Sequence, residues 1–147
     1  MEKIKVNLGE NTHHIYIDFP LEKIGEKIKN SNFGEKFIIL SDNNVFPLYG
    51  EKVKKSIEKE NRIVKEIVIP PGEKQKNFNT CLKIIENFIK FGVNRDDTLI
   101  NLGGGVINDI GGFISSIYMR GIKYISIPTT LLAQVDASIG GKTGINL

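Results

Sequence analysis

The sequence predicts an α/β domain with a mostly parallel sheet flanked by helices. Strand-length apolar runs alternate with helical patterns along the 147 residues, which is typical of strands joined by crossover helices. Residues 37–40 form a continuous apolar run, as expected for a strand buried on both faces of such a sheet. Residues 98–102 form another apolar run, and consecutive glycines at 103–105 follow it. The length suits one domain with a substantial core.

The N-terminal residues predict a small hairpin at the edge of a sheet. Residues 3–8 and 14–18 alternate between polar and apolar types, and residues 9–11 form a turn between them. His13 and His14 are adjacent, so on a strand their side chains point to opposite faces. A metal site at this histidine pair is therefore not expected.

Helical and strand patterns alternate through the rest of the chain. In order, we expect a helix from Pro20 through Ile28, a lysine-rich helix to about Glu60, a strand at 63–69, a helix from about Asn77 to Gly92, helical residues to about Arg120, a strand at 124–127 and a short helix from Leu131. The expected apolar face of the helix after Asn77 consists of Phe78, Cys81, Leu82, Ile85, Phe88 and Ile89.

The composition is that of an ordinary globular protein. Hydrophobic residues make up 40% and charged residues 25%, and the net charge of +3 is too small to indicate a nucleic-acid partner. The single cysteine, Cys81, predicts a core residue in a reducing compartment. No signal-peptide pattern and no apolar run of membrane-spanning length is present, so we expect a cytoplasmic protein without a membrane partner.

The glycine turn at 103–105 predicts an anion site. A backbone that passes from strand into helix without side chains leaves N–H groups free, and a helix N-terminus favours negative charge. Asp42 and Asn44 follow the strand at 37–40, at the end where open α/β sheets bind ligands. Two interpretations of these residues remain open: a carboxylate that holds ribose hydroxyls, or a cap for a helix that begins near Val45.

Two familiar phosphate-binding motifs fit only in part. The dinucleotide fingerprint G-x-G-x-x-G places its first glycines within 103–105 but its last on Asn108. The acidic candidate Asp42 also precedes the glycines, so a standard Rossmann domain is a poor match. A P-loop ending in Lys142 would need glycine at the position of Asp136, whose carboxylate would repel a phosphate.

Taken together, these segments resemble the 3-dehydroquinate synthase family, a group of NAD- and metal-dependent cyclases of the shikimate pathway. The matching segments are residues 41–45, 71–73 with Lys76, 103–106 with Asp109, 112–113, 118–121 and 128–144. The resemblance implies a Rossmann-like NAD-binding domain. Related sugar-phosphate cyclases share much of the pattern, whereas iron-type alcohol and glycerol dehydrogenases share the fold and the acid-before-glycine order but not the C-terminal motif.

The resemblance also implies a cofactor site and a substrate site. Asp136 and Lys142 would face the substrate and the nicotinamide together, and Arg120 would bind the substrate phosphate across a dimer interface. These roles suit the chemistry, because a guanidinium matches phosphate as a fork and a lysine stabilises an oxyanion. Simpler alternatives are that Arg120 complements a helix C-terminus and that Thr129 and Thr130 cap a helix. The residues implied to bind NAD are Asp42, Asn44, Gly72, Glu73, Lys76, Gly104, Gly105, Val106, Asn108, Asp109, Thr129, Thr130 and Lys142.

Asn108 departs from the family pattern, in which glycine usually occupies this position. Asparagine tolerates unusual backbone angles better than most residues. We therefore expect the loop to keep its conformation.

The family reaction converts 3-deoxy-arabino-heptulosonate 7-phosphate to 3-dehydroquinate and phosphate, and full-length members are expected to be homodimers. Their zinc or cobalt is held by a glutamate and two histidines in a helical C-terminal domain, and no such ligands are found among residues 1–147. We therefore expect this chain to hold much of the NAD site and to be inactive alone. Alternatives are the same domain of another sugar-phosphate cyclase or of an iron-type dehydrogenase, and a non-catalytic binding module.

Overall fold

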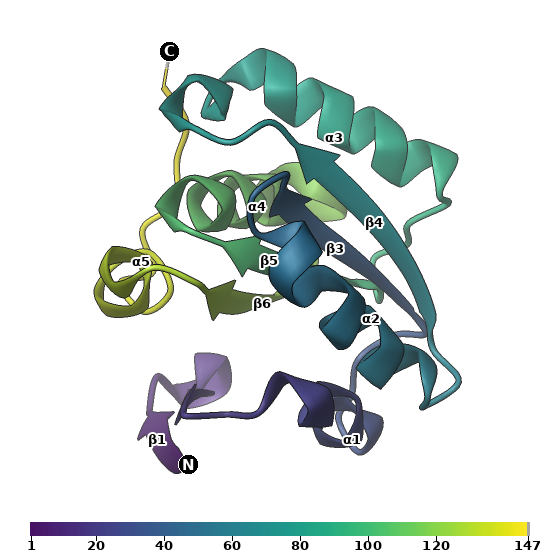
Figure 1. Ribbon diagram of the computed structural model, residues 1–147, viewed down its shortest axis with the longest axis vertical. Coiled ribbons are helices and arrows are strands. Elements are labelled where there is room, and N and C mark those ends of the chain that lie inside the picture. Colours follow the sequence, from purple (N-terminus) through teal and green to yellow (C-terminus); the bar gives the residue numbers. More distant parts are fainter. Residues whose placement is uncertain (147) are drawn as a thin grey trace.

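The computed structural model describes residues 1–146, which form two sheets and the helices around them (Figure 1). The main sheet has four parallel strands in the order β4-β3-β5-β6, and β1 pairs with β2 in a separate antiparallel sheet. The strands are β1 (Glu2–Val6), β2 (His13–Ile17), β3 (Lys36–Asp42), β4 (Ile63–Ile69), β5 (Thr98–Gly103) and β6 (Lys123–Pro128). The α-helices are α1 (Ile24–Lys29), α2 (Glu51–Glu58), α3 (Phe78–Lys90), α4 (Gly105–Ile117) and α5 (Leu131–Val135). The predicted α/β class is confirmed.

β3 and β5 occupy the centre of the main sheet because their sequences are apolar on both faces. Every residue of β5 is buried, and in β3 only Lys36 is partly exposed. Successive side chains point to opposite faces. Ile38 and Leu40 therefore pack with α3 and α4, whereas Phe37 and Ile39 pack with α1 and α2. The result is a three-layer domain with helices on both faces of the sheet (Figure 1).

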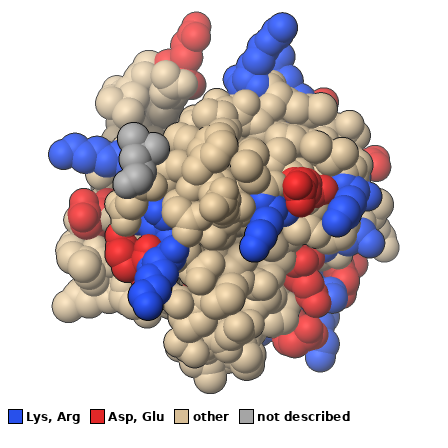
Figure 2. All heavy atoms as spheres, turned by 90° about the horizontal axis from the view of Figure 1, so that it is seen from above, with Lys and Arg blue, Asp and Glu red and all other residues tan. Residues whose placement is uncertain are grey.

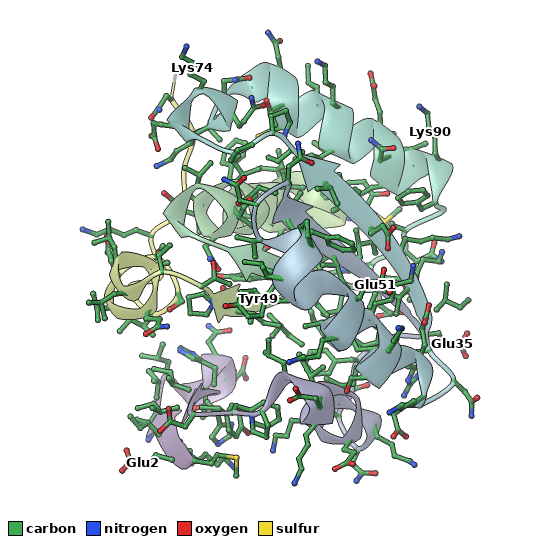
Figure 3. All side chains as sticks on the ribbon, in the orientation of Figure 1. Glu2, Glu35, Tyr49, Glu51, Lys74 and Lys90 are labelled. Atoms are coloured by element: carbon green, nitrogen blue, oxygen red, sulfur yellow. The ribbon has the colours of Figure 1, made fainter. Side chains whose placement is uncertain are left out.

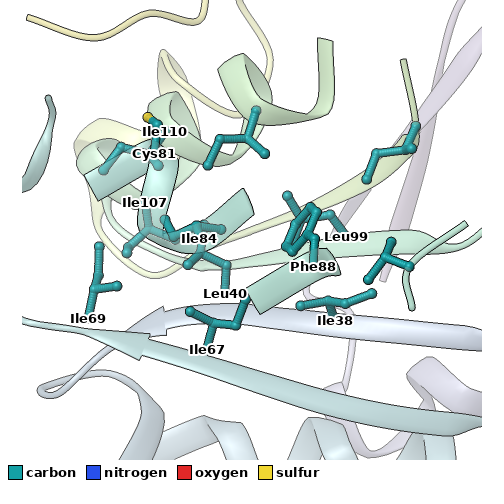
Figure 4. Close-up of a cluster of buried hydrophobic side chains, with 13 residues drawn as sticks. Ile38, Leu40, Ile67, Ile69, Cys81, Ile84, Phe88, Leu99, Ile107 and Ile110 are labelled. Carbon is teal, nitrogen blue, oxygen red and sulfur yellow. The ribbon is translucent and has the colours of Figure 1, made fainter. Parts of the chain in front are cut away.

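The larger of the two hydrophobic clusters lies between the sheet and the layer of α3 and α4 (Figure 4). Cys81 and Phe88 of α3 are fully buried there, and the Phe88 ring meets Tyr118 edge-on at 5.1 Å. Burying one large apolar side chain stabilises a fold by roughly 1.5–3 kcal/mol. Cys81 is a free thiol, and burial raises its pKa. The prediction of a core cysteine is confirmed.

The N-terminal hairpin forms as predicted, and it is separate from the main sheet. β1 and β2 pair only with each other and lie next to α1 (Figure 1). The Tyr16 ring packs edge-on against Phe19 at 5.7 Å, and the Lys27 ammonium lies 4.7 Å from the same ring. Most residues of both strands are exposed. Alternation in the sequence therefore indicated strands correctly without indicating which strand they adjoin.

The predicted apolar face of α3 was half wrong. The helix buries Cys81 and Phe88 as expected, but Phe78, Leu82 and Ile89 are 52%, 43% and 66% exposed. Figure 2 looks onto the molecule from above and shows charged side chains separated by broad uncharged areas. Lys74 and Lys90 lie at opposite ends of the α3 layer and point away from the body (Figure 3).

The order of the strands places a topological switch point between β3 and β5. The chain passes from β3 to β4 on one side and then crosses back to β5 on the other. The helix after β3 covers one face and the helix after β5 covers the other. Open α/β sheets bind ligands outside the carboxyl ends of the strands at such a switch point. Among residues 1–146, every helix is too short or too polar to span a bilayer.

Candidate functional site

The carboxyl ends of the parallel strands bring the predicted segments to one edge of the molecule. β3 ends at Asp42, β5 at Gly103 and β6 at Pro128, and β4 leads into the Pro-Pro-Gly corner. Because the strands are parallel, their carboxyl ends lie at the same edge of the sheet. The Ser41 hydroxyl donates to the Leu102 carbonyl at 2.7 Å and ties the two central strands together there.

The glycine turn has the geometry of an anion site. Gly104 is the N-cap of α4 with φ −74° and ψ −165°, and the helix begins at Gly105. The first N–H groups of an α-helix have no partner within the helix. A Cβ added at Gly105 would meet nothing within 4 Å, so the space beside the turn is open. A Cβ at Gly103 would lie 2.6 Å from Ile107 Cγ1, so this position requires glycine for packing.

The Asn108 side chain is buried under the glycine turn. Asn108 is 2% exposed, and its Nδ2 donates to the carbonyl oxygens of Gly103 at 2.9 Å and Gly104 at 3.0 Å. The residue lies inside α4 and has no positive φ angle. Tolerance of unusual backbone angles is therefore not what suits asparagine to this position, and that part of the expectation was wrong.

An ion pair connects the segment after β4 to α4. Lys76 Nζ lies 2.6 Å from Asp109 Oδ2, and the two side chains are 20% and 21% exposed. The hydrogen bond to Asp109 raises the pKa of Lys76 above its ordinary value, against the opposing effect of burial. Glu73 lies at the outer limit of an ion pair with Lys76, at 4.0 Å, and is 65% exposed. Lys76 and Asp109, both predicted site residues, are thus in direct contact.

Lys76 and Asp109 line an open hollow of about 330 Å³. Two lysines and two aspartates contribute to its wall, so it offers ammonium donors for anions and carboxylate acceptors for hydroxyl groups. The predicted catalytic pair, Asp136 and Lys142, is among them. The full lining is Lys76, Asp109, Asp136, Ala137, Lys142, Thr143 and Gly144.

The C-terminal segment, residues 141–146, holds one wall of this hollow in place. The Asn146 backbone N–H donates to the Lys76 carbonyl at 2.8 Å, and Asn146 Nδ2 donates to Glu73 Oε1 at 3.0 Å. Thr143 packs so closely on α4 that a Cβ at Gly112 would lie 2.1 Å from Thr143 Cγ2. Sequence reasoning missed Asn146, because a contact between segments this far apart has no local signal.

Where the sequence left alternatives open for Asp42, Thr129 and Thr130, the structure shows which backbone groups their side chains contact. Asp42 Oδ1 accepts from the backbone N–H groups of Asn44 and Val45 at 2.9 and 3.0 Å. Thr130 Oγ1 accepts from an N–H of α5 at 3.2 Å. The Thr129 hydroxyl is buried without a partner among residues 1–146. Capping of α5 by Thr130 is confirmed. Asp42 closes the turn that precedes the helical residues Phe46–Gly50, whose N-cap is Val45 and which receive no side-chain cap from residues 1–146, so the capping interpretation of Asp42 was wrong. Contacts of Asp42 and Thr130 with a ligand stay predictions.

Arg120 lies apart from this site within one chain. It follows the C-terminal end of α4, whereas the glycine turn lies at the N-terminal end, and a helix of 13 residues is about 20 Å long. Met119 and Arg120 both have positive φ angles, 48° and 65°. The expected contact of Arg120 with a phosphate across a dimer interface stays a prediction.

The metal implied by the family resemblance does not fit the part of the chain that the structure describes. No group of three or more histidine, cysteine, aspartate or glutamate side chains is placed there to hold an ion. His13 and His14 are exposed on the hairpin, far along the chain from the hollow.

The switch point and the glycine turn define a Rossmann-like α/β domain of the class that sugar-phosphate cyclases carry. The profile described as 3-dehydroquinate synthase N-terminal matches residues 66–147, more than half of the chain. The chain belongs to the 3-dehydroquinate synthase family. The 3-dehydroquinate synthase of Thermodesulfovibrio yellowstonii is 50% identical over 147 residues, which cover 99% of this chain and 41% of that protein.

Solved structures of other cyclases share the fold. A 2-deoxy-scyllo-inosose synthase complexed with carbaglucose-6-phosphate, NAD+ and Co2+ superposes with a TM-score of 0.89 at 24% identity, over 99% of this chain and 40% of that one. A 2-epi-5-epi-valiolone synthase from Streptomyces hygroscopicus with NAD+ and Zn2+ bound gives 0.71 at 35% identity, over 77% and 32%. The chain therefore spans about two fifths of the curated relative and one third to two fifths of these structures.

Proposed function

We propose that this chain is the NAD-binding part of a 3-dehydroquinate synthase, which converts 3-deoxy-arabino-heptulosonate 7-phosphate to 3-dehydroquinate and phosphate. The observation that carries the proposal is the open glycine turn at the start of α4 beside the hollow lined by Lys76, Asp109, Asp136 and Lys142. Membership of the family supports the reaction. That reaction is a property of proteins of which this chain spans about two fifths.

The residues at the strand ends fit NAD at its pyrophosphate. The first N–H groups of α4 and the positive end of the helix favour an anion, and Gly105 leaves room for its close approach. Asp109 would accept hydrogen bonds from the nicotinamide ribose. Asp42 and Asn44, at the end of the neighbouring strand, would contact the adenosine end.

The charged residues of the hollow would bind and orient the sugar-phosphate substrate. When bound, NAD would accept a hydride from the carbon that bears the substrate hydroxyl being oxidised. Lys142 would hold the oxygen of that hydroxyl as negative charge develops on it. Asp136, which also lines the hollow, would accept a hydrogen bond from a neighbouring hydroxyl and so orient the substrate. Lys76, held in place by its pair with Asp109, would present its ammonium group to the cofactor phosphates.

A second candidate is the same domain of another sugar-phosphate cyclase. The 35% identity to a 2-epi-5-epi-valiolone synthase favours it. The 50% identity to a 3-dehydroquinate synthase over 99% of the chain favours the first candidate more strongly.

Calorimetric titration of the 147-residue polypeptide with NAD tests the cofactor role. We expect one saturable site that weakens when Lys142 is replaced by methionine, which removes the charge and keeps the stem. A titration without saturable heat would contradict the proposal and favour a non-catalytic module. The polypeptide alone is proposed to be inactive, because the described residues provide no metal site. Steady-state phosphate release from the heptulosonate substrate by the purified polypeptide would contradict that.

A further inference from the structure

Two successive carbonyl groups of the glycine turn, those of Gly103 and Gly104, each accept two hydrogen bonds. The Gly103 carbonyl accepts from the Thr129 N–H at 3.0 Å and from Asn108 Nδ2 at 2.9 Å. The Gly104 carbonyl accepts from the Asn108 N–H at 3.1 Å and again from Nδ2 at 3.0 Å. One buried amide group therefore bridges two successive carbonyls.

Fixing these carbonyls also fixes the N–H groups on the opposite side of the same peptides. A peptide unit is planar and trans, so its C=O and the following N–H point in opposite directions. The Gly103 carbonyl shares a peptide with the Gly104 N–H, and the Gly104 carbonyl shares one with the Gly105 N–H. Glycine peptides rotate easily because no Cβ restricts them. A clamp on the two carbonyls therefore holds two N–H groups pointing away from Asn108.

We propose that Asn108 is a positioning residue for the NAD pyrophosphate: its buried side chain locks the glycine turn so that the N–H groups of Gly104 and Gly105 face the phosphate. Asn108 does not itself contact the cofactor. This inference rests on the proposed function for the identity of the anion. The turn is prepared before the ligand arrives, so binding does not have to order it.

Two simpler roles fit the structure less well. Direct contact with the cofactor conflicts with the 2% exposure of Asn108 and with the use of its Nδ2 on two carbonyls. A role in core stability alone does not explain why a side chain with an amide group occupies this buried position. A buried polar group is costly unless it is fully hydrogen-bonded, and Asn108 Oδ1 accepts no hydrogen bond from residues 1–146.

The test uses Asn108→Ala in the 147-residue chain, with Ser115→Ala as the matched control. Each carbonyl keeps its backbone partner in Asn108→Ala, so the variant is expected to fold. Ser115 is equally buried on α4, at 2%, and its hydroxyl makes no hydrogen bond to the described residues. Calorimetry should show that Asn108→Ala binds NAD and ADP-ribose about tenfold more weakly, by the same factor. Ser115→Ala should bind both as the parent chain does.

Other results would overturn the inference. Loss of affinity for NAD alone would place Asn108 at the nicotinamide end. A lower melting temperature with unchanged dissociation constants would make it a structural residue. Asn108→Asp provides a second check, because a carboxylate cannot donate to the carbonyls. It should bind both ligands more weakly still, and affinities equal to those of the parent chain would contradict the clamp.

Hydrogen exchange in the free protein keeps the inference testable without a ligand. In Asn108→Ala, the amides at positions 108 and 109 should exchange several-fold faster, because the first turn of α4 is no longer tied to the glycine carbonyls. Unchanged exchange at both amides would overturn the clamp. Failure of the parent chain to bind NAD would instead contradict the proposed function, and the exchange experiment would still decide the role of Asn108.

Discussion

Gly111 and Gly112, neighbours on α4, should respond differently to replacement by alanine, because an added Cβ would face different surroundings at each position. A Cβ at Gly112 would lie 2.1 Å from Thr143 Cγ2, whereas a Cβ at Gly111 would lie 1.9 Å from Asn101 Oδ1. Comfortable contacts need about 3.5–4.0 Å, so either neighbour would have to retreat by roughly 1.5 Å. Thr143 is exposed and belongs to the C-terminal segment, but Asn101 is fully buried in β5. Only Thr143 has room to move.

The expected changes in stability of the two alanine variants follow from whether the neighbouring side chain can move. Alanine gains about 1 kcal/mol over glycine in a helix interior, and overpacking a core costs about 1–3 kcal/mol. Gly112→Ala should therefore leave stability nearly unchanged. Gly111→Ala should lose up to about 2 kcal/mol, which lowers the melting temperature of a domain of this size by roughly 4–8 °C. Thermal unfolding followed by circular dichroism measures both.

Gly112→Ala should instead damage ligand binding. The displaced segment carries Lys142, and losing one charge-assisted contact costs about 1.5–3 kcal/mol, or roughly 10- to 100-fold in the dissociation constant for NAD. Calorimetry on the two variants separates the effects. An unchanged NAD affinity in Gly112→Ala, or a Gly111→Ala chain as stable as its parent, would refute the reasoning from these contacts.

Three further predictions concern the ion pair, a strained turn and the buried thiol. Lys76→Met should cost about 1 kcal/mol, since the pair with Asp109 is mostly buried but still one-fifth exposed. A double-mutant cycle with Asp109→Asn measures the coupling, and additive effects would contradict it. Because the pKa of Lys76 is raised from 10.5, the stabilisation is present below pH 10.5 and lost as pH rises through the raised pKa. Met119→Gly should stabilise the chain by about 1 kcal/mol by relieving its positive φ of 48°, and a lower melting temperature would oppose this. Cys81 should react with a thiol reagent at pH 8 far more slowly in the native chain than in denaturant, because burial raises its pKa; equal rates would contradict its burial.

The central strands were predictable because their sequences allow only one environment. β3 and β5 are apolar on both faces, and only the middle of a parallel sheet between two helical layers buries both. The buried face of α3 was not predictable in the same way. Phe78, Leu82 and Ile89 repeat at helical spacing as regularly as Cys81 and Phe88. Periodicity alone therefore cannot tell which of these two sets of residues faces the core.

The site was predictable where it depends on local backbone and unpredictable where it depends on contacts between distant segments. Glycines after a buried strand indicated the turn at the start of α4. The ion pair between Lys76 and Asp109 joins segments far apart in the sequence, and spacing carries no information on it. The role of Asn108 was hidden for another reason, because its two acceptors are carbonyl groups that every residue possesses.

The most direct test of the account is a map of the NAD contact on the backbone of the 147-residue chain, which at 16.4 kDa suits solution NMR. Titration with NAD should shift the amide signals of Gly104, Gly105 and Val106 most, with smaller shifts at Lys76 and Lys142. Shifts confined to the hairpin or to the outer face of α3, with the start of α4 unaffected, would contradict the claim that the glycine turn binds the cofactor.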